Sequence, residues 1–174
     1  MRIETNRLNI VALEPDEIAM YADQMKELGD RLGFHSSGNP EEWFAAIVRK
    51  QALLAKMDPV NAFWHTFWLI IRKTDASFVG SIDFKHVPTS DGTVEIGYGI
   101  EKAYEGLGYM TETVRAFAEH AVRHLGIAHV IAETEKDNAA SMRVLEKSGF
   151  IRTKETDTAY WWEYKSQAMK PASK

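Results

Sequence analysis

The 174-residue sequence contains no cysteine, and none of its apolar runs approaches the roughly 18 residues needed to cross a bilayer. Without cysteine, the chain can form neither a disulfide framework nor a thiolate zinc site, and it has no cysteine nucleophile. Residues 1–10 carry three charged side chains and no apolar core of signal-peptide length. We therefore expect a cytoplasmic protein that has no contact with a membrane.

An excess of charge of one sign is also missing, because 21 Lys and Arg side chains stand against 25 Asp and Glu side chains, for a net charge of −4. Proteins whose main task is to bind a nucleic-acid backbone cluster Lys and Arg, so we expect no nucleic-acid partner. A local basic patch for a phosphorylated cofactor stays compatible with this balance. With 45% hydrophobic and 26% charged residues, the composition is that of an ordinary folded protein.

Linkers, repeats and low-complexity tracts are absent too, so we expect one domain over residues 1–168 and a tail over 169–174. Pro15 suits the first turn of a helix, and Gly29 suits its end. Adjacent antiparallel strands followed by β-α-β crossovers predict an α/β fold of the α+β kind, with one mixed sheet and helices packed on it. The expected strands are 8–13, 67–72, 78–85, 93–100, 128–133, 151–157 and 159–165, and the expected helices are 14–28, 41–57, 111–125 and 139–148.

The strand expected over Thr93–Ile100 has two unequal faces, because side chains alternate along a strand. Glu95, Gly97 and Gly99 share one face. Two glycines on one face weaken packing unless something must approach the backbone closely. This face either receives a ligand next to the Glu95 carboxylate or is simply turned to solvent.

Two glycines, Gly106 and Gly108, lie directly before the apolar-periodic helix that begins at Thr111. Glycines let successive N–H groups point into one concavity, and a helix start adds unpaired amides and partial positive charge. Such a site suits a diphosphate, although a plain loop is the alternative. A P-loop is excluded because Tyr109 and Met110 follow Gly108, where Lys and Ser or Thr would be needed.

A second helix start lies at Asn138, which is a natural N-cap with Ser141 on the first helical turn. Gly149 suits the end of that helix. Both residues at the helix start therefore have a structural explanation as well as a functional one.

Four segments occur in the same order and at matching spacing as in the GNAT superfamily of N-acetyltransferases, and the sequence is most similar to its RimJ/RimL-type branch. They are Glu4–Leu8, the strand with Glu95 and Gly97, the Gly106–Thr111 loop with Glu112, and Asn138–Ser141 continued to Gly149 and Phe150. The resemblance covers about residues 2–165. It implies the GNAT fold, in which a largely antiparallel sheet splays open in the middle and carries helices on both faces.

The resemblance also implies an acetyl-CoA site. The pantetheine arm would pair with the backbone of Tyr98, Gly99 and Ile100, Asn138 would contact the arm, and Ser141 would lie near the thioester sulfur. Glu105 and Met110 depart from the residues that the family usually has in the loop, so we expect slightly altered cofactor affinity. The diphosphate would bind the amides of Gly106, Leu107, Gly108, Tyr109, Met110 and Thr111.

The implied reaction is acetyl transfer to a primary amine, which must be neutral to attack. Because a protein α-amine has a pKa near 8 and a lysine amine one near 10.4, a general base helps both. We expect Glu95 to be that base, with Glu133 or water as alternatives. Ser141 would donate to the leaving thiolate, and a backbone amide near Tyr98–Ile100 would hold the oxyanion. The acceptor is either a protein N-terminus or a small amine, and a non-catalytic acyl-CoA-binding module is the alternative function.

Other tempting residues receive structural interpretations. His120 and His124 lie one helical turn apart but lack an evident third ligand, so we expect surface histidines and no metal site. A homodimer is compatible with the exposed edges of a splayed sheet. Strand aromatics usually pack in a core, and an acceptor pocket is the alternative for Trp64, Phe67, Trp68, Tyr160, Trp161 and Trp162.

Overall fold

The computed structural model of the chain describes residues 1–36 and 38–165, so the expected tail over 169–174 lies outside the described residues. The helices are α1 (Pro15–Asp23), α2 (Met25–Leu32), α3 (Glu42–Met57), α4 (Tyr109–His124) and α5 (Ala139–Ser148), with 3-10 turns η1 (Ala62–His65) and η2 (Lys102–Tyr104). The strands are β1 (Arg2–Glu4), β2 (Leu8–Ala12), β3 (Phe67–Arg72), β4 (Phe78–Phe84), β5 (Thr93–Ile100), β6 (His129–Glu135), β7 (Phe150–Glu155) and β8 (Ala159–Tyr164).

All eight strands form one sheet in the order β1-β2-β3-β4-β5-β6-β8-β7. Every neighbouring pair is antiparallel except β5 and β6, which are parallel and joined through the crossover helix α4. The expected mixed, largely antiparallel sheet is thereby confirmed. No helix in the described part of the chain has the length and apolar character that a membrane crossing requires.

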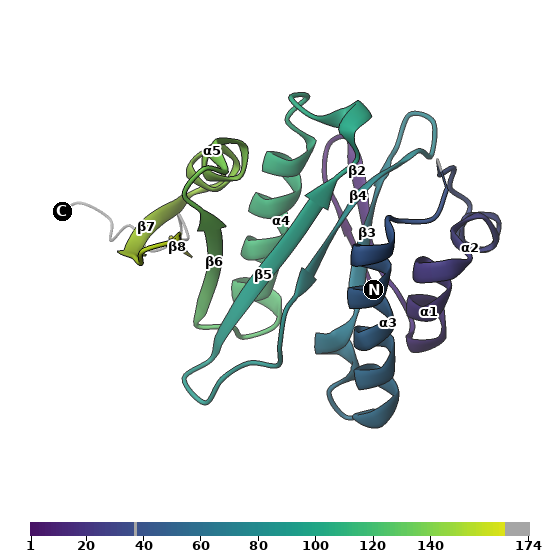
Figure 1. The fold of residues 1–174 in the computed structure, drawn as a ribbon, viewed down its shortest axis with the longest axis horizontal. Helices are drawn as coiled ribbons and strands as arrows, with labels where there is room; N and C mark the ends of the chain where they lie inside the picture. The colour runs from purple at the N-terminus through teal and green to yellow at the C-terminus, as the bar shows by residue number, and fades with distance from the viewer. Residues whose placement is uncertain (37, 166–174) are drawn as a thin grey trace.

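Helices cover both faces of the sheet, and each face has its own apolar core (Figure 1). On one face, α4 packs Val114, Phe117 and Ala121 against strand residues such as Trp68 and Ile82. On the other face, α1 and α3 pack against the alternate side chains of β3. That second core contains Ile18, Tyr21, Val48, Phe67, Leu69 and Ile71. Alternation along the strands therefore separates an α4 face from an α1/α3 face.

The N-terminal third differs from the sequence-based prediction in two ways. The helix expected over residues 14–28 is two helices, because Gln24 leaves the helical conformation with φ −138° and ψ 48°. The side chain of Asn39 satisfies both exposed ends of the break: its oxygen accepts from the Met25 amide at 2.9 Å and its nitrogen donates to the Asp23 carbonyl at 3.0 Å. The short edge strand β1 was not expected, since it has only three residues.

Gly29 does not end a helix, contrary to the prediction, because α2 continues to Leu32 and ends at Gly33 with φ 77°. A Cβ added to Gly29 would lie 2.6 Å from the carbonyl oxygen of Phe34. Gly29 therefore allows the returning chain to approach the helix closely.

The C-terminal half follows the prediction more closely. Asn138 caps α5, since its side chain accepts from the Ser141 amide at 3.0 Å, and Gly149 ends the helix with φ 96°. The helix α4 begins at Tyr109, two residues before the predicted start at Thr111, because Gly108 occupies the N-cap position in the left-handed conformation. Its first two side chains, Tyr109 and Met110, are buried in the α4-face core.

Candidate active site

The divergence of β5 and β6 creates the opening expected from the sequence. The two strands pair only at their beginnings, where Thr93, Val94 and Glu95 face His129, Val130 and Ile131. Beyond Glu95 the strands separate, and Figure 1 shows them spreading apart with α4 behind them. The C-terminal part of β5 thus has a neighbour on the β4 side alone.

The backbone of β5 presents alternate residues to this opening. The Lys85 amide donates to the Glu95 carbonyl at 2.9 Å, so the peptide groups of Glu95, Gly97 and Gly99 point toward β4. Ile96, Tyr98 and Ile100 therefore direct theirs toward the diverging strand. Of the three residues expected to hold the cofactor arm, Tyr98 and Ile100 have this orientation, whereas the Gly99 peptide faces Ser81 on β4.

The loop between η2 and α4 offers unpaired amides beside the opening. Gly106 and Gly108 have φ values of 72° and 80°, which side-chain-bearing residues rarely adopt. Within the described part of the chain, none of the amides of residues 106–111 donates a hydrogen bond. Six consecutive free amides at the start of a 16-residue helix form a site that fits an anionic group such as a diphosphate.

The two departures from the family pattern in this loop do not obstruct the amides. Glu105 is exposed, so its carboxylate can turn to solvent. The Met110 side chain is 5% exposed and packs into the α4-face core, away from the loop surface. The Met110 amide remains free on the other side of the backbone.

An ion-pair network from the N-terminal segment braces this loop, and it was not predicted. The Glu112 carboxylate accepts from the Thr5 hydroxyl at 2.6 Å, the Arg7 amide at 2.9 Å and Arg7 Nε at 2.7 Å. Arg7 Nη1 also donates to the Leu107 carbonyl at 3.0 Å, and its guanidinium lies 4.4 Å from the centre of the Tyr109 ring. These contacts give a physical reason for the Glu4–Leu8 segment of the resemblance.

Electrostatics at Glu112 follow from these contacts. Burial acts to raise the pKa of Glu112, but the Thr5 hydroxyl, the Arg7 amide and the Arg7 guanidinium together lower it below its ordinary value of 4.5. Glu112 therefore stays charged at neutral pH and holds Arg7 against the loop.

Ser141 lies at the opposite side of the opening and is joined to β5 by a side-chain contact. The Tyr98 and Ser141 hydroxyls are 2.7 Å apart, and Tyr98 also donates to the Ser141 carbonyl at 3.4 Å. Burial raises the pKa of Tyr98 to about 12, although the Ser141 hydrogen bond acts to lower it. The pair is therefore a neutral hydroxyl couple that connects β5 with α5.

Glu95 lies on the α1/α3 face at the point where β5 and β6 separate. Its carboxylate forms a close ion pair with Lys85 Nζ, and its side chain is only 12% exposed. Glu133, the alternative base, is exposed on β6 beyond the last residue that pairs with β5. The structure thus places Glu95 in the more enclosed position.

A third carboxylate, Asp83, lies next to Glu95 and was missed in the sequence. It stands opposite Gly97 in the β4–β5 register, and a Cβ added to Gly97 would lie 3.0 Å from Asp83 Oδ1 and 3.4 Å from Lys85 Cε. Because Gly97 has no side chain, the side chains of Asp83 and Lys85 can occupy the space above it. The signal that could have identified it is an acidic residue in a strand that is otherwise apolar and small.

A family model described as an acetyltransferase (GNAT) domain matches residues 7–151, which is most of the chain. The chain belongs to the GNAT acetyltransferases. The enzymes of this family use acetyl-CoA as the acetyl donor, and the free amides at the start of α4 fit the diphosphate of that donor.

Relatives with similar sequences or structures agree with this membership. The N-acetyltransferase YjdG of Bacillus subtilis is 27% identical over 164 residues, which are 93% of this chain and 96% of YjdG. The ribosomal-protein-S5-alanine acetyltransferase from Vibrio fischeri has a TM-score of 0.69 at 16% identity and covers 98% of this chain and 100% of its own. RimL, a ribosomal L7/L12 alpha-N-protein acetyltransferase solved with coenzyme A, has a TM-score of 0.64 at 15% identity and covers 94% and 97%. The fold expected from the RimJ/RimL-type resemblance is confirmed.

Aromatic and histidine side chains of this GNAT domain mostly serve packing. Phe67, Trp68 and Trp162 are at most 4% exposed, so they cannot line an open acceptor pocket, while Trp64 is partly buried against Phe84. His120 is partly buried rather than fully exposed, whereas His124 is exposed as predicted. The ring of His120 contacts Trp68, its Nε2 is buried without a partner in the described structure, and burial lowers its pKa. The described residues contain no cluster of three side chains that could hold a metal ion.

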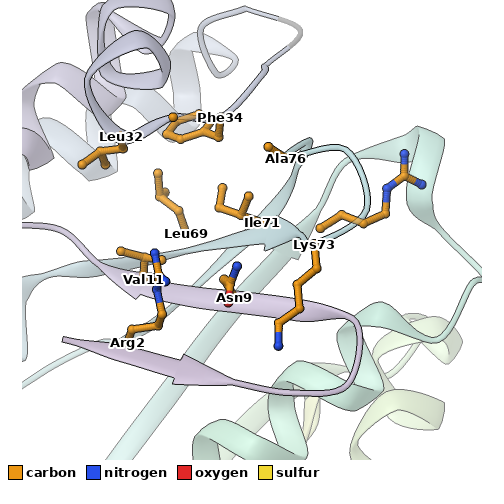
Figure 2. Close-up of a pocket in the computed structure, with 11 residues that line it drawn as sticks. Arg2, Asn9, Val11, Leu32, Phe34, Leu69, Ile71, Lys73 and Ala76 are labelled. Atoms are coloured by element: carbon orange, nitrogen blue, oxygen red, sulfur yellow. The ribbon is translucent and has the colours of Figure 1, made fainter.

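Two hollows of the GNAT domain differ in their relation to the site. A cavity of about 170 Å³ lies between β1–β3 and the end of α2, lined by residues such as Asn9, Leu69 and Phe34 (Figure 2). It contains none of the predicted site residues. A second, open hollow lies beside the loop and includes Thr5, Gly108 and Thr111.

Proposed function

We propose that this GNAT domain transfers the acetyl group of acetyl-CoA to a primary amine by direct attack, the acceptor being a protein N-terminus or a small amine. The observation that carries the proposal is the separation of β5 from β6 after Glu95, which leaves the peptide groups of Tyr98 and Ile100 without a partner strand. Unpaired strand edges bind extended ligands through main-chain hydrogen bonds.

In this proposal, two backbone segments hold the donor. The pantetheine arm pairs with Tyr98 and Ile100, and the free amides of residues 106–111 hold the diphosphate. Asn138 contacts the arm from the start of α5 and keeps its side-chain oxygen on the Ser141 amide as a cap. Arg7 holds the loop in place through Glu112 and Leu107.

Side chains perform the proton transfers. Bound acetyl-CoA supplies an activated acetyl thioester. Glu95 accepts a proton from the acceptor amine, directly or through water, because it is the enclosed carboxylate nearest to the point where the strands separate. Ser141 donates a hydrogen bond to the departing thiolate, and Tyr98 orients the Ser141 hydroxyl at 2.7 Å. An amide of Tyr98 or Ile100 stabilises the oxyanion.

The test is thiol release from acetyl-CoA with a panel of acceptors: peptides with free N-termini, polyamines, aminoglycosides and free amino acids. We expect release with at least one class. Coenzyme A binding measured by calorimetry, without release for any acceptor, would instead indicate an acyl-CoA-binding module. Absence of coenzyme A binding would refute the proposal as a whole.

Variants of two carboxylates locate the base. Glu95→Gln should lower kcat/KM by about 10²- to 10³-fold, since a positioned general base contributes rates of this order. Coenzyme A affinity should stay unchanged. Glu135→Gln is the matched control, because Glu135 is an exposed carboxylate at the end of β6, and its removal should leave turnover unaffected. A loss in Glu133→Gln alone would move the assignment to Glu133.

A further inference from the structure

We propose that Asp83 and Glu95 form a carboxylate pair on the α1/α3 face that selects a cationic primary amine as acceptor, and that Asp83 is the member which takes the proton of its ammonium group. This inference rests on the proposed acetyl transfer and reassigns one role within it: Asp83 takes the proton that the proposed function gives to Glu95, and Glu95 instead stays charged and helps to hold the ammonium group. It follows from the placement of Asp83 beside Gly97, from the residues around it and from its unused hydrogen-bonding capacity.

The carboxylate of Asp83 is a polar group without a partner. It lies on β4 directly opposite Gly97, next to the Lys85–Glu95 ion pair. In the described part of the chain, no group donates a hydrogen bond to it and no cation lies within 4.0 Å. A partly buried carboxylate is costly unless it gains a donor, and an ammonium group supplies up to three.

The surroundings of Asp83 determine its charge. Lys85 follows directly after the end of β4, Glu95 lies on β5 and Tyr21 lies on α1, where the Tyr21 hydroxyl donates to Ser81 at 3.0 Å. The residues that β3 and α3 bury on this face include no titratable group. Desolvation raises the pKa of Asp83 to about 7, with Glu95 adding to the rise and Lys85 opposing it. A base that titrates near neutral pH can both accept a proton and release it to solvent.

The proton balance of the step is complete. One proton of the acceptor ammonium moves to Asp83, and the neutral amine attacks the thioester carbonyl carbon, so that a C–N bond forms and the C–S bond breaks. The second proton that nitrogen loses goes to the departing thiolate, which leaves as the free thiol. Asp83 then returns its proton to solvent. Glu95 remains charged throughout and, with Asp83, holds the ammonium before transfer.

The role of Lys85 follows from the same arrangement. Its ammonium occupies Glu95 in the absence of an acceptor, and a substrate ammonium would compete for that carboxylate. A neutral acceptor such as an alcohol would break the Lys85–Glu95 ion pair without placing another cation beside Glu95. The site therefore favours amines that are cationic at neutral pH.

The test is the pH profile of kcat/KM for the wild-type enzyme with two acceptors whose amine pKa values differ by a unit or more. A titration step of the profile (a limb) that comes from an enzyme group stays at the same pH for both acceptors. The limb that comes from the amine moves with the pKa of the amine. We expect the enzyme limb near pH 7. Asp83→Asn should abolish it and lower kcat/KM at pH 7 by at least tenfold. Glu95→Gln should shift it to lower pH, and Lys85→Gln should shift it to higher pH.

Stability provides a readout that does not depend on turnover. Because the pKa of Asp83 is raised in the folded state, its contribution to stability is complete at low pH and is lost as pH rises toward 7. Asp83→Asn should therefore become more stable relative to wild type as pH rises from about 4 to about 7. The control Asp157→Asn, at an exposed turn between β7 and β8, should show no such trend.

Each outcome is decisive. If the wild type releases thiol and Asp83→Asn keeps the same enzyme limb, the inference is wrong and the proposed function stands. If the limb disappears in Glu95→Gln and persists in Asp83→Asn, Glu95 alone is the base. If the wild type transfers acetyl groups to no amine, the proposed function itself fails.

Discussion

The proposed donor side and the proposed acceptor side of β5 are built from different parts of the polypeptide. On the donor side, the groups available for binding are backbone amides: those of residues 106–111 and the unpaired peptide groups of β5. On the acceptor side, the available groups are the side chains of Asp83, Lys85 and Glu95, which meet across two strands. The donor is common to the whole family, whereas the acceptor differs between its members.

This difference suggests how one fold can serve many acceptors. Amide donors depend on backbone conformation, so glycines and a helix start suffice and most side chains can change. A side-chain cluster depends on strand register and on the identity of each residue, so a single substitution alters which acceptor fits. The two sides should consequently respond differently to mutation, and each prediction below tests one of them or their connection.

Apart from the carboxylate variants described above, the largest effect is expected from a side chain at the N-cap of α4. Gly108→Val forces a β-branched residue to φ 80° and places its Cβ 3.5 Å from Arg7 Nη2. Left-handed strain of about 1–2 kcal/mol should reorient the free amides and weaken coenzyme A binding by about 5- to 30-fold. Calorimetry measures the affinity.

The matched control is Gly126→Val, since Gly126 has φ 71°, meets no neighbouring atom at its Cβ and lies at the far end of α4. It should lose similar stability and retain coenzyme A affinity. Equal losses of affinity in both variants would mean that the loop amides have no special role.

The second effect concerns the hydroxyl couple that joins the two sides. Ser141→Ala should lower kcat by about tenfold, because a hydrogen bond to a charged leaving group contributes about 1.5 kcal/mol at the lower end of its usual range. Tyr98→Phe should lower it less, since Tyr98 acts through Ser141. Single-turnover kinetics separate this step from binding. Unchanged turnover in Ser141→Ala would remove Ser141 from the mechanism.

The backbone conformation of the proposed donor side was largely predictable from the sequence, whereas the side-chain cluster of the proposed acceptor side was not. Gly106 and Gly108 before an apolar-periodic helix, and Asn138 at the start of another, are local signals that hold in isolation. The pairing of Asp83 with Gly97 depends on the β4–β5 register, which local patterns do not fix. The break at Gln24 is similar, because Asn39 stabilises it from 14 residues or more away. The Arg7–Glu112 contact spans 105 residues, and its chemical reason emerged only from the fold.

A smaller effect is expected on stability from the brace behind the loop. Glu112→Gln weakens three hydrogen bonds and should lower the free energy of unfolding at pH 7 by about 1–2 kcal/mol, because solvent screens the exposed part of Arg7. Since the pKa of Glu112 is lowered in the folded state, the carboxylate stabilises the protein above its ordinary value of 4.5, and this contribution is lost as pH falls below it.

Urea unfolding of wild type and Glu112→Gln at several pH values measures this contribution. The two curves should converge at acidic pH. A difference that stays constant down to pH 3 would mean that the charge of Glu112 contributes nothing.

The smallest effect should come from crowding the acceptor side without removing a charge. Gly97→Ala places a Cβ 3.0 Å from Asp83 Oδ1, so the carboxylate must move by a few tenths of an ångström, and kcat/KM for the amine should fall by about threefold, or roughly 0.6 kcal/mol. Coenzyme A affinity should not change, because the Gly97 peptide faces β4. If the loss arises through Asp83, then Gly97→Ala should have almost no further effect in an Asp83→Asn background, since residues in contact are not additive. Additive losses in the double variant would show that Gly97 acts on the donor side instead, and the separation of the two sides along β5 would no longer hold.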